Sequence, residues 1–355
     1  MLFGGGDGIV SIDLSGGLAE YREFVYGERP DDPEMRESVN AWIWDGGAEV
    51  GIPRIGVEAV ADQWDLHDIQ VNLATADGRV FNAPGPGKKH DPMGADGKAR
   101  LLGAGPLSFE LIEPYRHWRM RLDGEMAEST VAAQIAGERP DSPVLVPVEI
   151  EIDIRAAVPP WENGAMLADA KRVLDEQDEG ALMGGPRFEQ LGRATGGVRI
   201  AGDEYPIDGG ALRIRRQGIR RLGTFRGHAW QSALFPSGRA FGYIAYPARE
   251  DGLPTYNEGY IFDGDGELIP AWVVDAPWLR RLHPKDEDVS VVLETDRGTT
   301  SIQATSVLAN FTVMGGVGAN PDFPVLQQAI VRYTWDGETA NGMMERSTRG
   351  GQIVR

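Results

Sequence analysis

The sequence predicts an all-β protein with two antiparallel barrel or sandwich domains and a short helical connection between them. Glycine and proline are too frequent for a helical protein, at 47 and 23 of 355 residues. They separate short runs in which apolar and polar residues alternate, which is the pattern of half-buried strands. Hydrophobic residues make up 41% of the chain, enough to form a buried core.

The clearest strand pattern is the run VLVPVEIEIDIRAAV at residues 144–158. Ile150 and Ile152 would face one side of this strand, with Glu149 and Glu151 on the other, because side chains alternate with a period of two. Similar runs occupy residues 69–81, 108–124, 227–246 and 328–337. Turn pairs that end in glycine, and that are expected to close hairpins, occur at 77–78, 237–238, 263–264 and 297–298.

A single helix is expected at residues 163–180, NGAMLADAKRVLDEQDEG. Met166, Ala170 and Val173 would form an apolar stripe along it, and Gly180 would end it as a C-cap. Because this segment lies at the midpoint of the chain, it is predicted to link the two domains.

The expected domains are residues 1–180 and 181–355, each a β domain. DGRVF at 77–81 and SGRAF at 237–241 share glycine, arginine and phenylalanine at the same spacing. Each of these segments also follows a strand that carries tryptophan. This faint internal repeat favours two related domains.

The charge of the chain excludes several classes of partner. It carries 54 acidic and 35 basic side chains, a formal net charge of −19, which repels phosphate backbones and anionic lipid surfaces. No nucleic-acid partner is therefore expected. The absence of cysteine excludes disulfides and thiolate chemistry and is typical of a reducing compartment. There is no apolar run long enough to span a membrane and no signal-peptide pattern, so a cytoplasmic location is expected.

No metal site and no dinucleotide-binding loop are expected. The five histidines are scattered and form neither an HxH nor an HExxH pair. DGDGE at 263–267 lacks the sixth-position glycine and the closing glutamate of an EF-hand loop, so it is interpreted as a hairpin turn. GGGDG at 4–8 neither follows a strand nor opens a helix, as a dinucleotide-binding loop would.

Polar side chains beside aromatic ones mark the candidate catalytic groups. His67 and Asp68 follow Trp64 into a predicted strand, and His228 shares a strand face with Trp230. An acid in such a place could protonate an alkene carbon while aromatic faces stabilise the carbocation. The candidate substrate-binding residues are Trp64, Tyr115, Trp118, Trp230, Tyr243 and Tyr246. The alternative is that all these residues line barrels or rims with satisfied hydrogen bonds.

Five arginines occur within nine residues of DGGALRIRRQGIRR (208–221), at positions 213, 215, 216, 220 and 221. In a strand, Arg213 and Arg215 would share one face, and Ile214 and Arg216 the other. A phosphate-binding cup would need glycine-rich amides or a helix N-terminus, which are not evident here. Pairing with the many carboxylates of the chain is the commoner explanation.

Residues 187–221, RFEQLGRATGGVRIAGDEYPIDGGALRIRRQGIRR, resemble the second domain of the hydroxyneurosporene synthase-like, or carotenoid 1,2-hydratase-like (AttH-like), superfamily. The matching elements are the FEQ…G…TG…V…G lead-in, the IDG at 207–209, Arg213, Gly218 and Arg220. Residues 332–347 are similar to the closing strand of that family, with Glu345 after a glycine-rich turn. Residues 113–124 and 147–161 resemble its first domain. The resemblance implies two lipocalin-like (calycin-type) β domains.

The chain departs from the family at an acidic position. Members commonly follow the glycine-rich turn with an Arg-Asp-(His/Arg)-Ser-Trp-Gly-x-Arg pattern. Here Ile214 stands at the aspartate position, Arg216 at the serine position and Gln217 at the tryptophan position. If that aspartate is the usual proton donor, another acid, Asp68 or Glu345, would have to replace it. Otherwise the protein binds its ligand without hydrating it.

The resemblance implies an enzyme that adds or removes water at a C=C bond, or isomerises or cyclises its substrate without a cofactor. The substrate would be an isoprenoid, steroid-like or polyketide-like molecule held between the two domains. Asp68 or His67 would donate or relay the proton, with His228 assisting. Arg213 and Arg220 would support the domain interface.

A carrier for a hydrophobic small molecule is the main alternative, because lipocalin-like cups hold hydrophobes without chemistry. A structural partner in a larger complex is a third interpretation, and a homo-oligomer is compatible with all three. The pocket distinguishes the first two. An enzyme should bury a carboxyl or imidazole group against an aromatic wall, whereas a carrier should have an apolar cup with polar groups only at its mouth.

Overall fold

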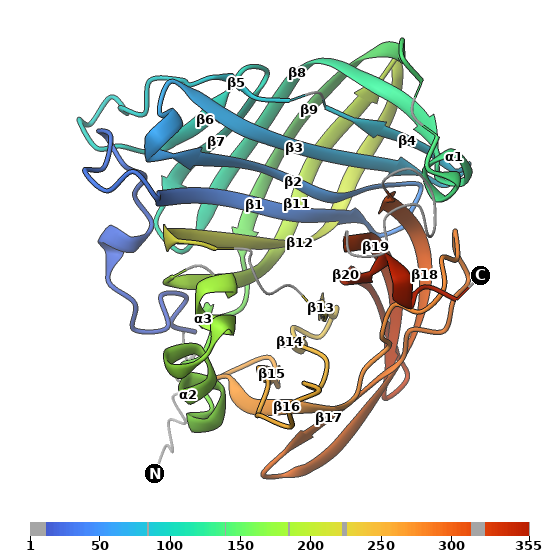
Figure 1. Ribbon diagram of the computed structural model, residues 1–355. Coiled ribbons are helices and arrows are strands. Elements are labelled where there is room, and N and C mark those ends of the chain that lie inside the picture. The colour runs from blue at the N-terminus through green and yellow to red at the C-terminus, as the bar shows by residue number, and fades with distance from the viewer. Residues whose placement is uncertain are drawn as a thin grey trace, which may run out of the picture.

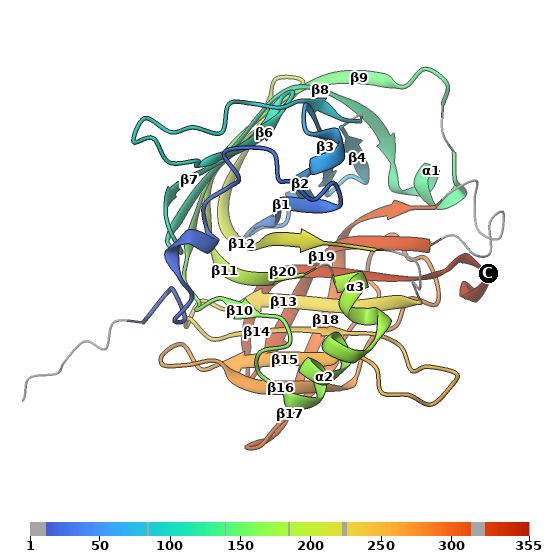
Figure 2. The same cartoon turned by 60° about the vertical axis from the view of Figure 1, so that its left-hand side comes forward.

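Two antiparallel β-barrels, packed against each other, make up the fold (Figure 1). It is a computed structural model that describes residues 12–83, 85–138, 140–183, 185–221, 226–313 and 324–354. In both views the first barrel, coloured blue to yellow-green, lies above the second, coloured yellow to red (Figures 1 and 2). The prediction of an all-β chain with two barrel domains is confirmed.

The first barrel is a closed circuit of strands. In circuit order these are β11 (Arg187–Ile200), β12 (Asp203–Ile219), β1 (Met35–Asp45), β2 (Val50–Val60), β3 (Leu66–Thr75), β4 (Arg79–Asn82), β8 (His117–Thr130) and β9 (Val144–Ala156). β9 closes the circuit because it pairs with β8 on one side and β11 on the other. Short strands extend the sheet: β5 (Gly87–Lys88), β6 (Leu101–Ala104), β7 (Leu107–Glu113) and β10 (Trp161–Glu162).

The second barrel follows the chain order without crossovers. Its strands are β13 (Gly227–Leu234), β14 (Ala240–Ala245), β15 (Asn257–Phe262), β16 (Ile269–Asp275), β17 (Val291–Thr295), β18 (Gly298–Thr312), β19 (Pro324–Trp335) and β20 (Glu338–Arg349), and β20 pairs with β13. The predicted hairpins are confirmed in both barrels. Their glycines all have φ between +87° and +123°, the region that favours glycine: Gly78, Gly238, Gly264 and Gly298.

The boundary between the two sheets differs from the one expected at residue 180. β11 and β12 pair with β9 and β1, so residues 187–219 belong to the first barrel. The second barrel begins at Gly227. These pairings join segments that are far apart in the chain, so the local strand pattern does not reveal them.

Helices are short and lie outside the barrels (Figure 2). α2 (Ala168–Glu176) and α3 (Asp178–Met183) replace the single helix predicted at 163–180. The predicted helix end at Gly180 is wrong, because that residue lies within α3 and α2 ends at its C-cap Gln177. α1 (Val131–Ala136) follows β8 and contacts β18 of the second barrel. Single 3-10 turns are η1 (Glu20–Arg22), η2 (Ala61–Gln63) and η3 (Gly350–Gln352).

The connection ahead of α2 is attached to the second barrel by Glu258 of β15, whose side chain is fully buried. Its carboxylate accepts hydrogen bonds from Gly164 N (2.6 Å), Met166 N (3.0 Å), Leu167 N (2.8 Å) and Trp161 Nε1 (3.0 Å). Several donors satisfy a buried carboxylate in place of water. The connection therefore crosses between the barrels at a fixed place.

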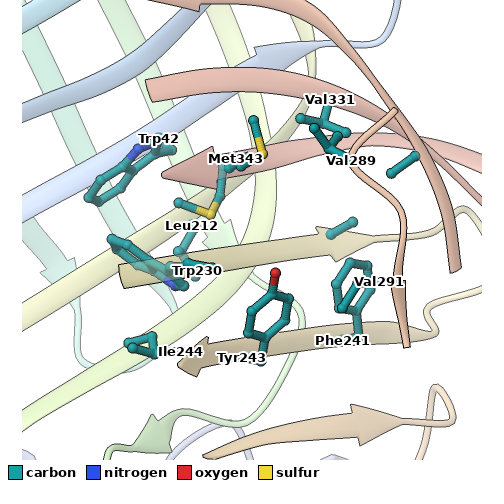
Figure 3. Close-up of a cluster of buried hydrophobic side chains, with 14 of the residues drawn as sticks. Trp42, Leu212, Trp230, Phe241, Tyr243, Ile244, Val289, Val291, Val331 and Met343 are labelled. Atoms are coloured by element: carbon teal, nitrogen blue, oxygen red, sulfur yellow. The ribbon is translucent and has the colours of Figure 1, made fainter. Parts of the chain in front are cut away.

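β1 is buried on both faces, which shows how the barrels meet. Val39 and Ile43 face the core of the first barrel, whereas Trp42 and Trp44 belong to a core that continues into the second. Figure 3 shows Trp42 beside Trp230 of β13, and their ring centres are 4.6 Å apart in an edge-to-face contact. One apolar core therefore runs from the outer face of the first barrel into the second barrel.

Candidate active site between the two barrels

A small pocket lies where the two barrels meet. Its walls come from β1, β2, β11 and β12 of the first barrel and from β13, β14 and β20 of the second, with Leu182 of α3 at one side. Its volume is about 70 Å³. That is about half of the roughly 150 Å³ of an engineered cavity that holds benzene. The pocket as it stands suits a group of a few heavy atoms.

His228 and Glu345 form a hydrogen-bonded pair on the wall of this pocket. The pairing of β13 with β20 sets Trp230 opposite Glu345 and His228 opposite Ser347. His228 Nε2 lies 3.1 Å from Glu345 Oε1, and His228 Nδ1 lies 2.6 Å from Ser347 Oγ. Both ring nitrogens therefore have partners that fix the orientation of the imidazole.

Glu345 is ionised in this setting. Burial by itself raises its pKa, but the hydrogen bond with His228 and the charge of Arg54 lower the pKa to about 2. Arg54 Nη1 lies 3.6 Å from Glu345 Oε2, and Gln328 Nε2 donates to the same oxygen at 2.5 Å. A carboxylate with such a pKa is a hydrogen-bond acceptor at neutral pH and not a proton donor.

Four arginines line the pocket: Arg54, Arg187, Arg216 and Arg220. Arg187 is paired with Glu189, with Nη2 and Oε1 2.5 Å apart. The Nε atoms of Arg54, Arg187 and Arg216 are buried and have no hydrogen-bond acceptor. The pocket is therefore positively charged, although the chain as a whole has a net charge of −19.

The start of β11 is brought against the end of β12 by two glycines. Gly185 has φ +75°, and a Cβ atom there would lie 2.9 Å from Gly218 Cα, closer than such atoms approach each other. This close passage places Arg187 directly opposite Arg216 in the antiparallel register. Like charges in opposite positions destabilise a sheet. The sequence thus places two arginines where they repel each other.

Trp42 and Trp230 form the aromatic wall of the pocket. Each has a guanidinium over its ring, with Arg54 5.6 Å from the centre of Trp42 and Arg187 4.8 Å from that of Trp230. Trp230 Nε1 donates to Glu189 Oε2 at 3.0 Å. Burial raises the pKa of Glu189, although the positive charge of Arg187 acts to lower it. Both aromatic faces are therefore already in contact with cations.

Arg213 and Arg215 lie on the opposite face of β12, inside the first barrel, as the strand alternation predicts. Arg213 Nη2 lies 2.8 Å from Glu23 Oε1, and Arg215 Nη2 lies 2.5 Å from Glu37 Oε1. All four side chains are almost fully buried. Within the same stretch, Arg216 faces the pocket instead. The arginine-rich run thus divides into an internal, paired set (Arg213 and Arg215), a set at the pocket (Arg216 and Arg220) and the exposed Arg221, which is bound to Glu34 at 2.6 Å.

Asp68 and His67 lie outside this pocket, on β3 of the first barrel. Asp68 is exposed. His67 is buried beside Trp64, with ring centres 5.5 Å apart, and burial lowers the pKa of His67. The structure does not bring these three residues together with His228.

Tyr115, Trp118 and Tyr243 also lie outside the pocket. Trp118 Nε1 and Tyr115 N donate to Glu23 Oε2 at 2.8 and 3.1 Å in the first barrel. Tyr243 OH donates to Gln231 Oε1 at 2.8 Å in the second. The predicted site residues that do line the pocket are His228, Glu345, Trp230, Tyr246 and Arg220.

Arg54, Arg187 and Trp42 line the pocket although they were not predicted there. A lone arginine in a strand resembles any surface arginine, so the sequence around Arg54 holds no distinguishing signal. Trp42 does have one. It lies in the run SVNAWIWD (38–45), which is apolar on both faces and so indicates a strand covered on both sides.

A larger hollow of about 720 Å³ lies along β8, β9, β11 and β12. Most of its charged side chains pair with one another, as Arg121 does with Glu151 at 2.9 Å and Arg199 with Glu149 at 2.8 Å. Most of its charged groups therefore already have a partner within the hollow. Among the residues that the structure describes, no cluster of three or more histidine or acidic side chains could hold a metal ion. No helix in these ranges is long and apolar enough to cross a membrane.

Comparison with known proteins supports the fold. A family model described as a domain of unknown function (DUF7064) matches residues 27–349. No curated protein matches the sequence. The crystal structure of a candidate AttH protein (NE1406) from Nitrosomonas europaea is similar, with a TM-score of 0.52 and 16% identity over 93% of this chain and 99% of that chain. The predicted AttH-like fold is thereby confirmed.

Two further crystal structures are similar at a lower level. CghA has a TM-score of 0.48 and 10% identity, over 89% of this chain and 88% of that chain. Kievitone hydratase from Nectria haematococca has the same TM-score and identity, over 92% of this chain and 93% of that chain. Because both TM-scores are below 0.5, these similarities say nothing about the chemistry of this chain.

Proposed function

We propose that this chain, which belongs to the family described as a domain of unknown function (DUF7064), is an acid–base enzyme. It acts at a C=C bond, by adding or removing water, shifting the double bond or closing a ring, in the pocket between the barrels. The observation that carries this proposal is the His228–Glu345 pair beside Trp230, in which Glu345 is buried and His228 is partly buried. A proton-transferring group held against an aromatic wall supports an enzyme over a carrier.

His228 is the proton-transferring group of the proposal. Because Glu345 is ionised, it accepts a hydrogen bond from Nε2–H, which leaves Nδ1 to accept one from the Ser347 hydroxyl. A proton gained by the ring gives an imidazolium that the charge of Glu345 stabilises. The ring then exchanges that proton with a carbon or oxygen atom of the substrate at the pocket wall.

Glu345 has a different role here from the one expected of a substitute proton donor for the acid missing at Ile214. Its pKa of about 2 keeps it ionised at neutral pH. It instead sets the charge and orientation of His228, as the carboxylate of a His–acid pair does. Ile214 lines the pocket and contributes apolar surface.

The charges around the pocket favour a reaction in which negative charge develops on the substrate. A carbocation would need free aromatic faces, but Arg54 and Arg187 already stand over Trp42 and Trp230. The same guanidinium groups would stabilise an enolate-like anion. Such an anion forms when water adds to a C=C bond next to a carbonyl or carboxylate group. The reacting group is therefore a C=C bond activated by a neighbouring carbonyl or carboxylate, and not the isolated alkene that the sequence suggested.

A carrier for a large hydrophobic molecule is less well supported. Such a protein would need an apolar cup of several hundred cubic ångströms. The pocket has a volume of about 70 Å³ and is lined by four arginines and the His228–Glu345 pair. Its polar groups lie in the wall and are not confined to a mouth.

Turnover is tested by incubating the protein with a panel of α,β-unsaturated acids, unsaturated ketones and terpenoids in H₂¹⁸O and, separately, in D₂O. Mass spectrometry then detects ¹⁸O after hydration and deuterium after isomerisation or cyclisation. His228→Asn is expected to lower the rate at least about 100-fold. The matched control is His90→Asn, because His90 lies outside the pocket.

Two results would contradict the proposal. One is a His228→Asn variant that keeps the wild-type rate. The other is a compound that stays bound during gel filtration and acquires no label in either solvent.

A further inference from the structure

Arg216 carries a buried positive charge without a counter-ion. It is 5% exposed and lines the pocket. Within the described ranges no carboxylate lies within 4 Å of it, and its buried Nε has no hydrogen-bond acceptor. The neighbouring Arg213 and Arg215 show the usual arrangement, since each is paired with a buried glutamate.

The groups around Arg216 add to its charge instead of balancing it. Arg187 lies directly opposite Arg216, on β11. The positive charges of Arg187 and Arg220 both repel the positive charge of Arg216. Glu58 acts in the other direction but is itself bound to Arg36 at 2.8 Å. Its charge is therefore already balanced.

Glu345 on the pocket wall and Glu189 behind it also have partners already. Glu189 is bound to Arg187 at 2.5 Å. Glu345 accepts from His228 at 3.1 Å and lies 3.6 Å from Arg54. Burial of a guanidinium without a counter-charge is unfavourable. The pocket as a whole therefore lacks negative charge, and a ligand can supply it.

We propose that Arg216, together with Arg187 and Arg220, binds an anionic group of the substrate, a carboxylate or a phosphate. This inference rests on the proposed function, because it assigns the substrate class of the same pocket. A volume of about 70 Å³ suits such a group. A planar guanidinium matches two oxygens of a carboxylate or phosphate. The rest of the substrate extends out of the pocket past the partly exposed Arg220 and Tyr246.

Binding is tested by isothermal titration calorimetry with three probes: trans-cinnamate, cinnamamide and inorganic phosphate. Cinnamamide matches cinnamate in shape but carries no charge, so this comparison needs no variant. We expect at least one of the two anions to bind, and cinnamamide to bind at least about tenfold more weakly than that anion. The tighter anion identifies the group as a carboxylate or a phosphate.

Arg216→Met removes the charge and keeps a long apolar side chain. We expect it to bind the preferred anion at least about tenfold more weakly than wild type. Without the anion, its melting temperature should be no lower than that of wild type, because an unpaired buried charge is lost. The matched control is Arg121→Met, because Arg121 is exposed and paired with Glu151 outside the pocket. This control should bind the anion like wild type.

The inference is overturned if neither anion binds, if cinnamamide binds as tightly as the preferred anion, or if Arg216→Met keeps the wild-type affinity. An equal loss in Arg121→Met also overturns it. His228→Asn separates the inference from the proposed function, since this variant should lose turnover and still bind the anion. Anion binding that depends on Arg216 in a protein without turnover would uphold the anion site and refute the enzyme.

Discussion

Arg213→Ala is expected to destabilise the first barrel and to leave the pocket nearly unchanged. Arg213 Nη2 donates to Glu23 Oε1 at 2.8 Å and to Gln190 Oε1 at 3.0 Å, and its guanidinium lies 5.1 Å from the ring centre of Trp118. Glu23 has no exposed surface. Truncation of Arg213 therefore leaves a buried carboxylate without its counter-charge.

The size of the loss follows from that carboxylate. Breaking a buried ion pair by removing one partner costs about 3–5 kcal/mol. The lower end applies here, because Trp118 Nε1 and Tyr115 N still donate to Glu23. In a domain of about 150–250 residues, a loss of about 3 kcal/mol lowers the melting temperature by about 6–12 °C.

The assay is thermal unfolding followed by circular dichroism, with cinnamate affinity measured in parallel by calorimetry. The double variant Glu23→Gln/Arg213→Ala removes both charges and should regain part of the lost stability. A melting temperature within about 2 °C of wild type would refute the structural role of Arg213. A stable variant that no longer binds cinnamate would place Arg213 among the ligand-binding residues.

The charge of Glu345 should make the stability of the fold sensitive to acid. Its pKa falls from 4.5 to about 2 on folding, so its stabilisation is complete above about pH 4.5 and is lost as the pH falls towards 2. In urea titrations, the stability advantage of wild type over Glu345→Gln should shrink by about 3 kcal/mol over this range. A constant difference would contradict the lowered pKa. Glu258→Ala should raise amide hydrogen exchange in residues 161–167, because Glu258 is the acceptor for three backbone N–H groups there. Unchanged protection would show that other contacts hold this segment.

The strands could be predicted because alternation is a local property. In β9, Ile150 and Ile152 are buried while Glu149 and Glu151 are exposed, as expected. The two faces of β12 were predicted for the same reason. The end of the first barrel could not be predicted in this way, because it depends on the pairing of β11 and β12 with β9 and β1. No local pattern encodes that choice of partner.

The site could be predicted only in part. His228 and Trp230 share a strand face in the sequence, and both line the pocket. Asp68 beside Trp64 has an equivalent local pattern but lies elsewhere, at an exposed position. These two local patterns lie in different surroundings because packing between the barrels covers one of them and not the other. Arg54 reaches the pocket for the same reason, through packing between segments distant in the chain.

The apolar core shared by the two barrels limits how a ligand can enter. A hinge motion that parted the barrels would separate Trp42 from Trp230 and expose both rings to water. Exposing a large apolar side chain costs at least about 2 kcal/mol, so such an opening would be rare. The partly exposed Arg220 and Tyr246 mark the rim of the pocket instead. If a ligand enters by rotation of these side chains, Trp42 and Trp230 stay in contact while the ligand binds and leaves.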